Sequence, residues 1–197
     1  MTKIIAFVNT KGGTGKTTST ICLSTALAGL RDVVVWDADP QGSATDWAEQ
    51  ALEAGDPLPF EVEVVNEALL KRARRNTEAD YAIIDTPPGH PRIIDQAVAM
   101  ADFVILPSSP AVIDLTRMLT TAASIPNEIP RAALLTRANK QTVAYKTAVE
   151  FLFESSEVPV FSHAIGDRQA IQNSFGSRPE IFYDYSAITD ELLEVME

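Results

Sequence analysis

Short apolar runs alternate with longer amphipathic stretches along most of the chain. Residues 4–8 read Ile-Ile-Ala-Phe-Val, and residues 33–36 read Val-Val-Val-Trp, with no polar position in either run. Strands with one face in water alternate polar and apolar residues, whereas strands covered by helices on both faces read as continuous apolar runs. The pattern therefore indicates a parallel sheet buried between helices.

The order of these segments predicts the fold class. Strands are expected over residues 4–8, 33–36, 60–65, 81–84, 103–106, 132–135 and 158–161. Helices are expected over residues 17–30, 44–54, 67–75 (with Asn66 as N-cap), 93–101, 113–123, 143–153, 168–175 and 187–196. This alternation is typical of an α/β fold with a doubly wound, mostly parallel sheet flanked by helices. No linker or repeat interrupts it, so residues 1–197 are expected to form one domain.

Composition and charge narrow the function. The 197 residues carry a net charge of −11, so bulk electrostatic attraction to nucleic acid is excluded, and any DNA contact needs a local basic patch. The single cysteine, Cys22, cannot form an intrachain disulfide and is expected in the core. No apolar run approaches the roughly 20 residues of a membrane span. A cytoplasmic protein is expected.

A glycine-rich segment lies between the first strand and the first helix. Residues 9–18 read Asn-Thr-Lys-Gly-Gly-Thr-Gly-Lys-Thr-Thr. Glycines let successive backbone N–H groups surround phosphate oxygens, and the helix N-terminus adds partial positive charge. Lys16 is expected to reach the β- and γ-phosphates, and the Thr17 hydroxyl to bind Mg²⁺. A dinucleotide site of the Rossmann type would need glycine at Thr18 and has no use for Lys16.

Acidic residues follow two other predicted strands. Asp37 ends the second strand, Asp39 lies two residues further on, and Asp85 ends the strand over residues 81–84. Ligands of open α/β sheets bind at the carboxyl ends of strands, where carboxylates can hold Mg²⁺ and orient a water molecule. The alternative is that these aspartates only cap turns. Asp114 is expected to be a helix cap or a surface residue.

Three stretches resemble the ParA/MinD group of deviant Walker-A ATPases, and among them the small ParA partition ATPases without an N-terminal DNA-binding domain. Residues 11–18 match the deviant phosphate loop. Residues 37–45 (Asp-Ala-Asp-Pro-Gln-Gly-Ser-Ala-Thr) match its second motif, and residues 84–88 (Ile-Asp-Thr-Pro-Pro) match the Walker-B motif. The resemblance covers the whole chain.

The resemblance implies a role for each matching position. Lys11 would be the signature lysine that reaches the partner's phosphates in an ATP-sandwich dimer, and Asp39 would position the hydrolytic water. Asp37 and Asp85 would lie near Mg²⁺. The remaining nucleotide contacts would come from the loop and the adenine pocket: Gly12, Gly13, Thr14, Gly15, Lys16, Thr17, Thr18, Thr136 and Arg137.

The family also implies a function and partners. It suggests a slow, partner-stimulated ATPase that cycles between a monomer and an ATP-bound homodimer, binds DNA without sequence preference, associates with the nucleoid and positions a plasmid or chromosome with a small cargo-binding protein. Exposed basic residues in the family's DNA-binding region would be Lys140, Lys146, Arg168 and Arg178. The basic run over residues 71–75 is a further possible contributor.

Other functions stay open at this level. A positioning ATPase for another cargo, such as a conjugation or organelle factor, would carry the same motifs, as would a MinD-like cell-division regulator. MinD-type proteins bind membranes through a basic C-terminal helix, whereas residues 189–197 here contain four acidic residues and no lysine or arginine. Membrane binding is therefore disfavoured. A P-loop metabolic ligase or kinase is the third alternative, which Lys11 and the second motif disfavour.

Overall fold

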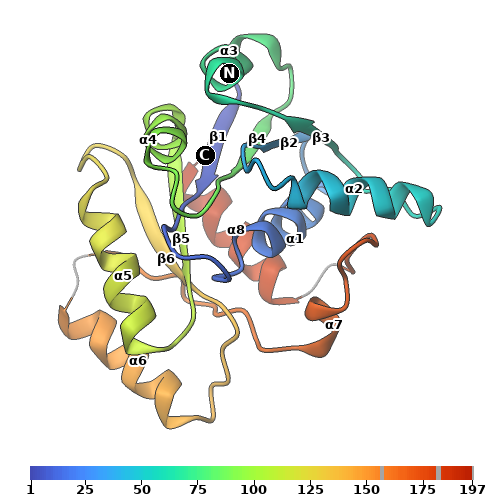
Figure 1. Cartoon of the computed structure of the whole chain (residues 1–197). Helices are drawn as coiled ribbons and strands as arrows, with labels where there is room; N and C mark the ends of the chain where they lie inside the picture. Colours follow the sequence, from blue (N-terminus) through green and yellow to red (C-terminus); the bar gives the residue numbers. More distant parts are fainter. Residues whose placement is uncertain (156–157, 181–182, 197) are drawn as a thin grey trace.

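A computed structural model describes residues 1–155, 158–180 and 183–196 of the chain (Figure 1). Its elements in chain order are β1 (Lys3–Phe7), α1 (Lys16–Ala28), β2 (Val33–Asp37), α2 (Ser43–Glu53), β3 (Glu61–Val64), α3 (Glu67–Asn76), β4 (Tyr81–Asp85), α4 (Pro91–Met100), β5 (Phe103–Ser108), α5 (Val112–Ala123), β6 (Arg131–Leu135), α6 (Val143–Ser155), α7 (Gln169–Gln172) and α8 (Tyr183–Met196).

Six parallel strands form the sheet within the described residues. Their order is β3-β2-β4-β1-β5-β6, so the chain crosses over at each step and winds in both directions from β1. Each connection between successive strands carries a helix, α1 to α5 in turn, as parallel strands require. The predicted doubly wound α/β fold is confirmed.

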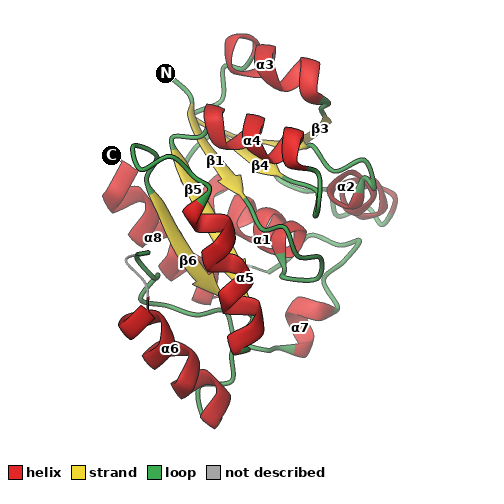
Figure 2. Ribbon diagram, turned by 60° about the vertical axis from the view of Figure 1, so that its left-hand side comes forward, coloured by secondary structure: helices red, strands yellow, loops and turns green. Residues whose placement is uncertain are grey.

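Helices cover both faces of the sheet (Figure 2). One apolar cluster joins β-strand residues such as Trp36 and Ile84 to α3, α4, α5 and α6. The other joins Phe7 and Ile83 to α1, α2, α7 and α8. Alternate residues of each strand face opposite clusters, so nearly every strand position of β1, β2 and β4 is buried. This explains why those strands read as uninterrupted apolar runs.

Two expected elements differ from the structure. Residues 158–161 do not form a strand; Val160 makes one isolated parallel bridge with Ala133 of β6. Pro159 has no N–H to donate, so a continuous ladder cannot form there. The helix expected over residues 168–175 is only the four-residue α7, and residues after it turn back through Gly176, whose φ is +75°.

Other local predictions are confirmed. The Asn66 side chain accepts hydrogen bonds from the N–H groups of Ala68 and Leu69, so Asn66 caps α3. Cys22 lies in the core. Among the helices of the described ranges, none is long and apolar enough to span a membrane.

Candidate functional site

The carboxyl ends of β1, β2 and β4 bring the three predicted motifs together. Phe7 of β1 pairs with Asp85 of β4, and Asp85 pairs with Asp37 of β2. The segment after β1 leads into the glycine-rich loop, while β2 and β4 end with the two aspartates. Sheet register therefore places residues from three distant parts of the sequence at one edge.

The glycine-rich loop leaves its donors available. Gly13 and Gly15 have φ values of +73° and +87°, a conformation that residues with a Cβ rarely adopt. Gly15 is the N-cap of α1 and, within the described chain, no side chain caps this helix. Residues of the first turn of α1 line a cavity of about 370 Å³, and no described side chain satisfies the positive partial charge of this helix end.

This phosphate-side cavity is lined by residues from the loop, the second motif and the segment after β4. They are Gly12, Gly13, Gly15, Lys16, Thr17, Thr18, Asp39, Gln41, Ser43, Pro88 and Arg137. Thr14 is buried beside it.

Lys16 is a buried cation at this cavity. Only 6% of the residue is exposed, and its ammonium group donates a hydrogen bond to the backbone oxygen of Lys11 at 3.2 Å. Burial lowers the pKa of Lys16, while the charges of Asp85 and Asp39 oppose that shift. A lysine held this way carries charge that water does not screen, which suits it to an anionic ligand.

Asp85 is buried behind Thr17, which lines the cavity. The Thr17 hydroxyl donates to Asp85 Oδ2 at 2.6 Å, whereas the buried Oδ1 has no hydrogen-bond partner among the described residues. Burial raises the pKa of Asp85 to about 7, against the opposing effect of the Thr17 hydrogen bond. A buried carboxylate oxygen without a donor, next to a threonine hydroxyl, fits the oxygen ligands that Mg²⁺ requires.

The other two aspartates have different surroundings. Asp37 is buried, and both its oxygens accept hydrogen bonds, Oδ1 from the Asp39 N–H and Oδ2 from the N–H and hydroxyl of Thr45. Asp37 thereby holds the turn between β2 and α2. Asp39 is partly exposed and lines the cavity, and its Oδ1 accepts from the Gln41 N–H. The roles of Asp39 in positioning the hydrolytic water and of Asp37 near Mg²⁺ stay predictions.

Lys11 points away from its own phosphate-side cavity. Its ammonium group lies 2.5 Å from Asp114 Oδ1 of α5, and the Lys11 side chain is 34% exposed. The other Asp114 oxygen accepts from the Ser109 hydroxyl, and the hydrogen bond from Lys11 holds the pKa of Asp114 below its usual range. The expectation that Asp114 is a helix cap or surface residue is wrong, because Ala111 is the N-cap of α5 and Asp114 is buried.

A second cavity, of about 550 Å³, continues from the first. Its lining comes from five parts of the chain: Gly15, Thr18, Ser19, Trp47, Thr136, Arg137, Ile165, Gly166, Asp167, Arg168, Ile171, Gln172, Phe175 and Tyr185. Thr136 and Arg137, expected at the adenine pocket, both line it. The Thr136 hydroxyl donates to the backbone oxygen of Thr14 at 3.0 Å, which ties β6 to the glycine-rich loop.

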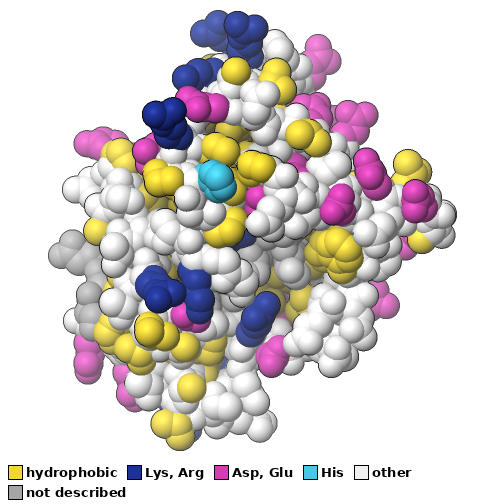
Figure 3. Space-filling view, viewed as in Figure 1, with side chains coloured by type: hydrophobic (Ala, Val, Ile, Leu, Met, Phe, Trp, Pro, Cys, Tyr) yellow, Lys and Arg dark blue, Asp and Glu magenta, His cyan; other side chains and the backbone are white. Residues whose placement is uncertain are grey.

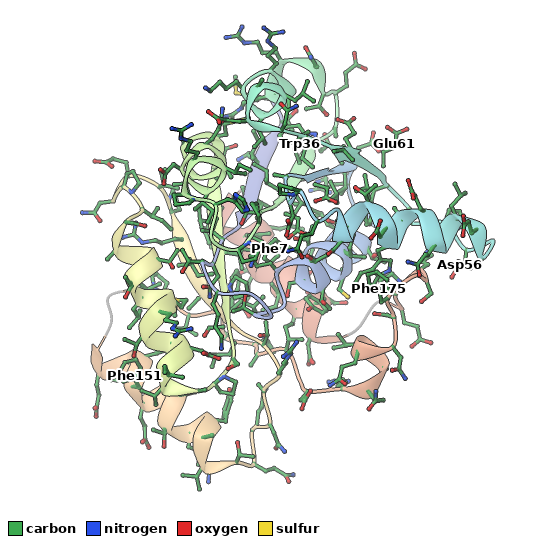
Figure 4. All side chains as sticks on the ribbon, viewed as in Figure 1. Phe7, Trp36, Asp56, Glu61, Phe151 and Phe175 are labelled. Atoms are coloured by element: carbon green, nitrogen blue, oxygen red, sulfur yellow. The ribbon has the colours of Figure 1, made fainter. Side chains whose placement is uncertain are left out.

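Two aromatic residues that line this second cavity, called here the base-side cavity, were not predicted from the sequence: Trp47 and Phe175. The rings of Trp47 and Phe175 lie 5.2 Å apart, and Trp47 Nε1 donates to the backbone oxygen of Ser177 at 2.7 Å. Figure 4 shows Phe175 below α2 and Trp36 above it. Nothing local in the sequence indicates that residues 47 and 175 meet.

The four candidate DNA contacts do not form one cluster. Lys140 precedes α6 and Lys146 lies on it, and α6 packs on one face of the sheet. Arg168 and Arg178 lie before and after α7, which packs on the other face. All four residues are exposed. Arg168 also pairs with Asp184 at 3.1 Å and lines the base-side cavity.

Comparison with solved structures establishes the fold independently. A plasmid partition protein from Borrelia burgdorferi bound to AMPPNP has a TM-score of 0.75 and 21% identity, covering 99% of this chain and 98% of that one. The septum site-determining protein MinD from Pyrococcus horikoshii, complexed with Mg-ADP, has a TM-score of 0.76 and 20% identity, covering 99% of this chain and 97% of that one.

Sequence comparison gives the family. The maintenance of carboxysome distribution protein A of Gloeobacter kilaueensis is 33% identical over 163 residues, which are 81% of this chain and 74% of that protein. Residues 5–178 match the CobQ/CobB/MinD/ParA nucleotide binding domain. With its three motifs at one edge of the sheet, this chain belongs to the CobQ/CobB/MinD/ParA family, among the ParA/MinD-type positioning ATPases.

Proposed function

We propose that residues 1–197 form one ParA-type ATPase domain whose ATP-bound homodimer binds DNA without sequence preference and positions a DNA cargo. The observation that carries this proposal is the different placement of two lysines of one loop. Lys16 lines the phosphate-side cavity, whereas Lys11 turns out of it and lies at the surface beside Asp114. The loop therefore offers one cation to its own nucleotide and a second to another subunit.

The nucleotide is ATP or ADP with Mg²⁺. Similar folds hold AMPPNP in the Borrelia protein and Mg-ADP in the Pyrococcus protein. Here the loop N–H groups and Lys16 would bind the phosphates, and the base would lie in the cavity walled by Thr136 and Trp47. Thr17 and Asp85 would hold Mg²⁺, with Asp37 supporting the site from behind Asp39. The metal supplies charge neutralisation at the β- and γ-phosphates.

Hydrolysis needs an oriented water and a cation at the γ-phosphate. Asp39 is a carboxylate that lines the phosphate-side cavity, and it would orient the attacking water. Lys11 of a second subunit would supply charge at the γ-phosphate, as an arginine finger does in other phosphoryl-transfer enzymes. Because that lysine comes from the partner, turnover would be slow in the monomer and would depend on dimerisation and on a stimulating partner protein.

DNA binding would use local positive charge on an acidic protein. On the face that Figure 3 shows, lysine and arginine side chains gather over α3 and α4 and again near the glycine-rich loop, while acidic side chains lie over α2 and β3. Doubling such a surface in a dimer adds phosphate contacts, which strengthens non-specific binding steeply. The monomer would then release DNA and the nucleoid, and the dimer would hold them.

The test is retention on DNA of arbitrary sequence. With Mg²⁺ and a non-hydrolysable ATP analogue, the wild-type protein should bind at low salt and lose affinity steeply as salt rises. Lys11→Ala should keep ADP affinity but lose dimerisation and DNA retention. Asp39→Ala should stay on DNA with ATP itself, because it cannot complete hydrolysis.

Three results would contradict the proposal. One is no DNA retention by the wild-type dimer at low salt. Another is Asp39→Ala that hydrolyses ATP at the wild-type rate. The third is phosphate transferred from ATP to a metabolite, which would indicate a ligase or kinase.

A different cargo is the alternative that one comparison favours. The Gloeobacter relative is a carboxysome distribution protein, which suggests a protein organelle as the cargo in place of a replicon. The motifs and the DNA-binding dimer would be the same. The small protein that stimulates ATP hydrolysis, identified by co-purification, separates the two: a sequence-specific DNA-binding protein indicates partition, and an organelle-bound protein indicates the alternative.

A further inference from the structure

Arg137 stands where the two cavities join. Three residues line both of them: Gly15, Thr18 and Arg137. Gly15 and Thr18 belong to the glycine-rich loop and the first turn of α1, whose N–H groups surround the α- and β-phosphates in phosphate loops. Arg137 comes from another part of the chain, two residues after β6.

Hydrogen bonds on both sides fix the backbone of Arg137. Before it, the Thr136 N–H donates to the Ser108 oxygen at 2.8 Å, and the Thr136 hydroxyl donates to the Thr14 oxygen. After it, the Ala138 N–H donates to the Ile165 oxygen at 2.8 Å. Hydrogen bonds therefore hold residues 136–138 to β5, to the glycine-rich loop and to the segment that leads to α7.

Between these hydrogen bonds, the backbone of Arg137 has an unusual conformation. Its φ is +51°, and it is the one non-glycine residue with a positive φ in the ranges that the structure describes. Side chains rarely adopt this region without a compensating reason, and residues that do so cluster at functional sites. Glycine would fit the same backbone without strain, so the arginine side chain itself is the feature to explain.

The guanidinium is also without a partner. Arg137 is exposed, and it makes no hydrogen bond or ion pair with the described residues. By contrast, Arg74, Arg131 and Arg168 each have an acidic or backbone partner. Arg137 lines both cavities together with Gly15 and Thr18 of the N-terminal turn of α1, where negative charge is favoured. A guanidinium has a planar set of donors that matches phosphate oxygens.

We infer that Arg137 is a phosphate-binding residue that contacts the α- and β-phosphates of the nucleotide bound in its own subunit. This inference rests on the proposed nucleotide site and adds a cation that the motifs do not contain. Its contribution would be the same for ADP and ATP, because both carry these two phosphates. It therefore differs from Lys11, which would act on the γ-phosphate from the partner subunit.

The experiment compares Arg137→Gly with wild type, measuring ADP and ATP-analogue affinity by calorimetry and inorganic pyrophosphate affinity by competition with labelled ADP. Glycine keeps the left-handed backbone, so the variant should melt at or above the wild-type temperature. Affinity for ADP, the ATP analogue and pyrophosphate should each fall about 10- to 100-fold. Arg137→Lys should lose less. Arg31→Gln, an exposed arginine before β2 at the opposite edge of the sheet, is the matched control and should bind as wild type does.

Each other outcome would overturn the inference. Wild-type affinity for ADP in Arg137→Gly would show that the guanidinium faces solvent. A loss for ADP with unchanged pyrophosphate affinity would assign Arg137 to the base or the ribose. Failure of the wild-type protein to bind ADP at all would refute the proposed function itself, and is distinguishable because it does not depend on the variant.

Discussion

The phosphate-side and base-side cavities join at Gly15 but are built in different ways. Most of the phosphate-side lining comes from two short segments, residues 12–18 and 39–43. The base-side lining is drawn from five parts of the chain between Gly15 and Tyr185. The first cavity is therefore encoded locally and the second by tertiary packing. A motif search finds the first kind and misses the second.

The two cavities also use different chemistry. The phosphate-side cavity is lined by the buried Lys16 and by Thr17, which hydrogen-bonds to the buried Asp85, and burial shifts the pKa values of both Lys16 and Asp85. The base-side cavity has an aromatic wall and a floor where Tyr185 and Ser19 share a hydrogen bond of 3.1 Å. Losing one group should thus be costly on the charged side and mild on the aromatic side.

The largest effect is expected for Lys16→Ala. Removing a buried ammonium that faces the phosphates deletes charge-assisted hydrogen bonds, so nucleotide affinity should fall about 100-fold or more. The nucleotide-free protein should not lose stability, because burial already disfavours the charged form of Lys16. Calorimetric titration with ADP and thermal melting check both parts. Near-wild-type affinity would show that Lys16 does not face the phosphates.

The second effect is a pH dependence from Asp85. Because its pKa is about 7 in the fold and near 3.8 when unfolded, the folded protein binds a proton that the unfolded chain has released. Its stabilising contribution is complete below pH 4 and is lost as pH rises through 7. Between pH 5 and 7 the loss is about 2 kcal/mol.

Urea unfolding of the metal- and nucleotide-free protein measures this loss. Asp85→Asn should not show it, because the amide does not ionise, and the stability of wild type relative to this variant should decrease from pH 5 to pH 7. Parallel pH profiles for the two proteins would show that Asp85 is ionised throughout.

The smallest effect is expected for Trp47→Phe on the aromatic side. The variant loses the Nε1 hydrogen bond to Ser177, which should lower the free energy of unfolding by about 1 kcal/mol. Tryptophan fluorescence should respond to ADP in Trp36→Phe, which keeps Trp47, and not in Trp47→Phe, because Trp36 is buried in the other apolar cluster. An ADP response that persists in Trp47→Phe would remove Trp47 from the base-side cavity.

Much of the fold could be predicted because the decisive signals are local. Continuous apolar runs located β1, β2, β4, β5 and β6, since burial on both faces confines polar residues to the ends of such strands. The error at residues 158–161 came from the same signal. That segment is apolar, but Pro159 removes a donor, and only Val160 pairs with β6.

The part of the candidate site that local motifs encode could also be predicted. The glycine-rich loop and the aspartates at strand ends are contiguous motifs, and the sheet register brings them to one edge. The partner of Lys11 was not predictable, because Asp114 is more than a hundred residues away and its burial depends on how α5 packs. Trp47 and Phe175 escaped for the same reason.

The ion pair between Lys11 and Asp114 has a thermodynamic consequence. A lysine already paired within its subunit gains only the difference between two pairings when it moves to a partner's phosphate. The transfer is an exchange of anions, so its driving force depends on how much more negative charge the γ-phosphate offers than one carboxylate. Association of two subunits would therefore depend on how many phosphates the bound nucleotide carries, and less on whether a nucleotide is bound at all.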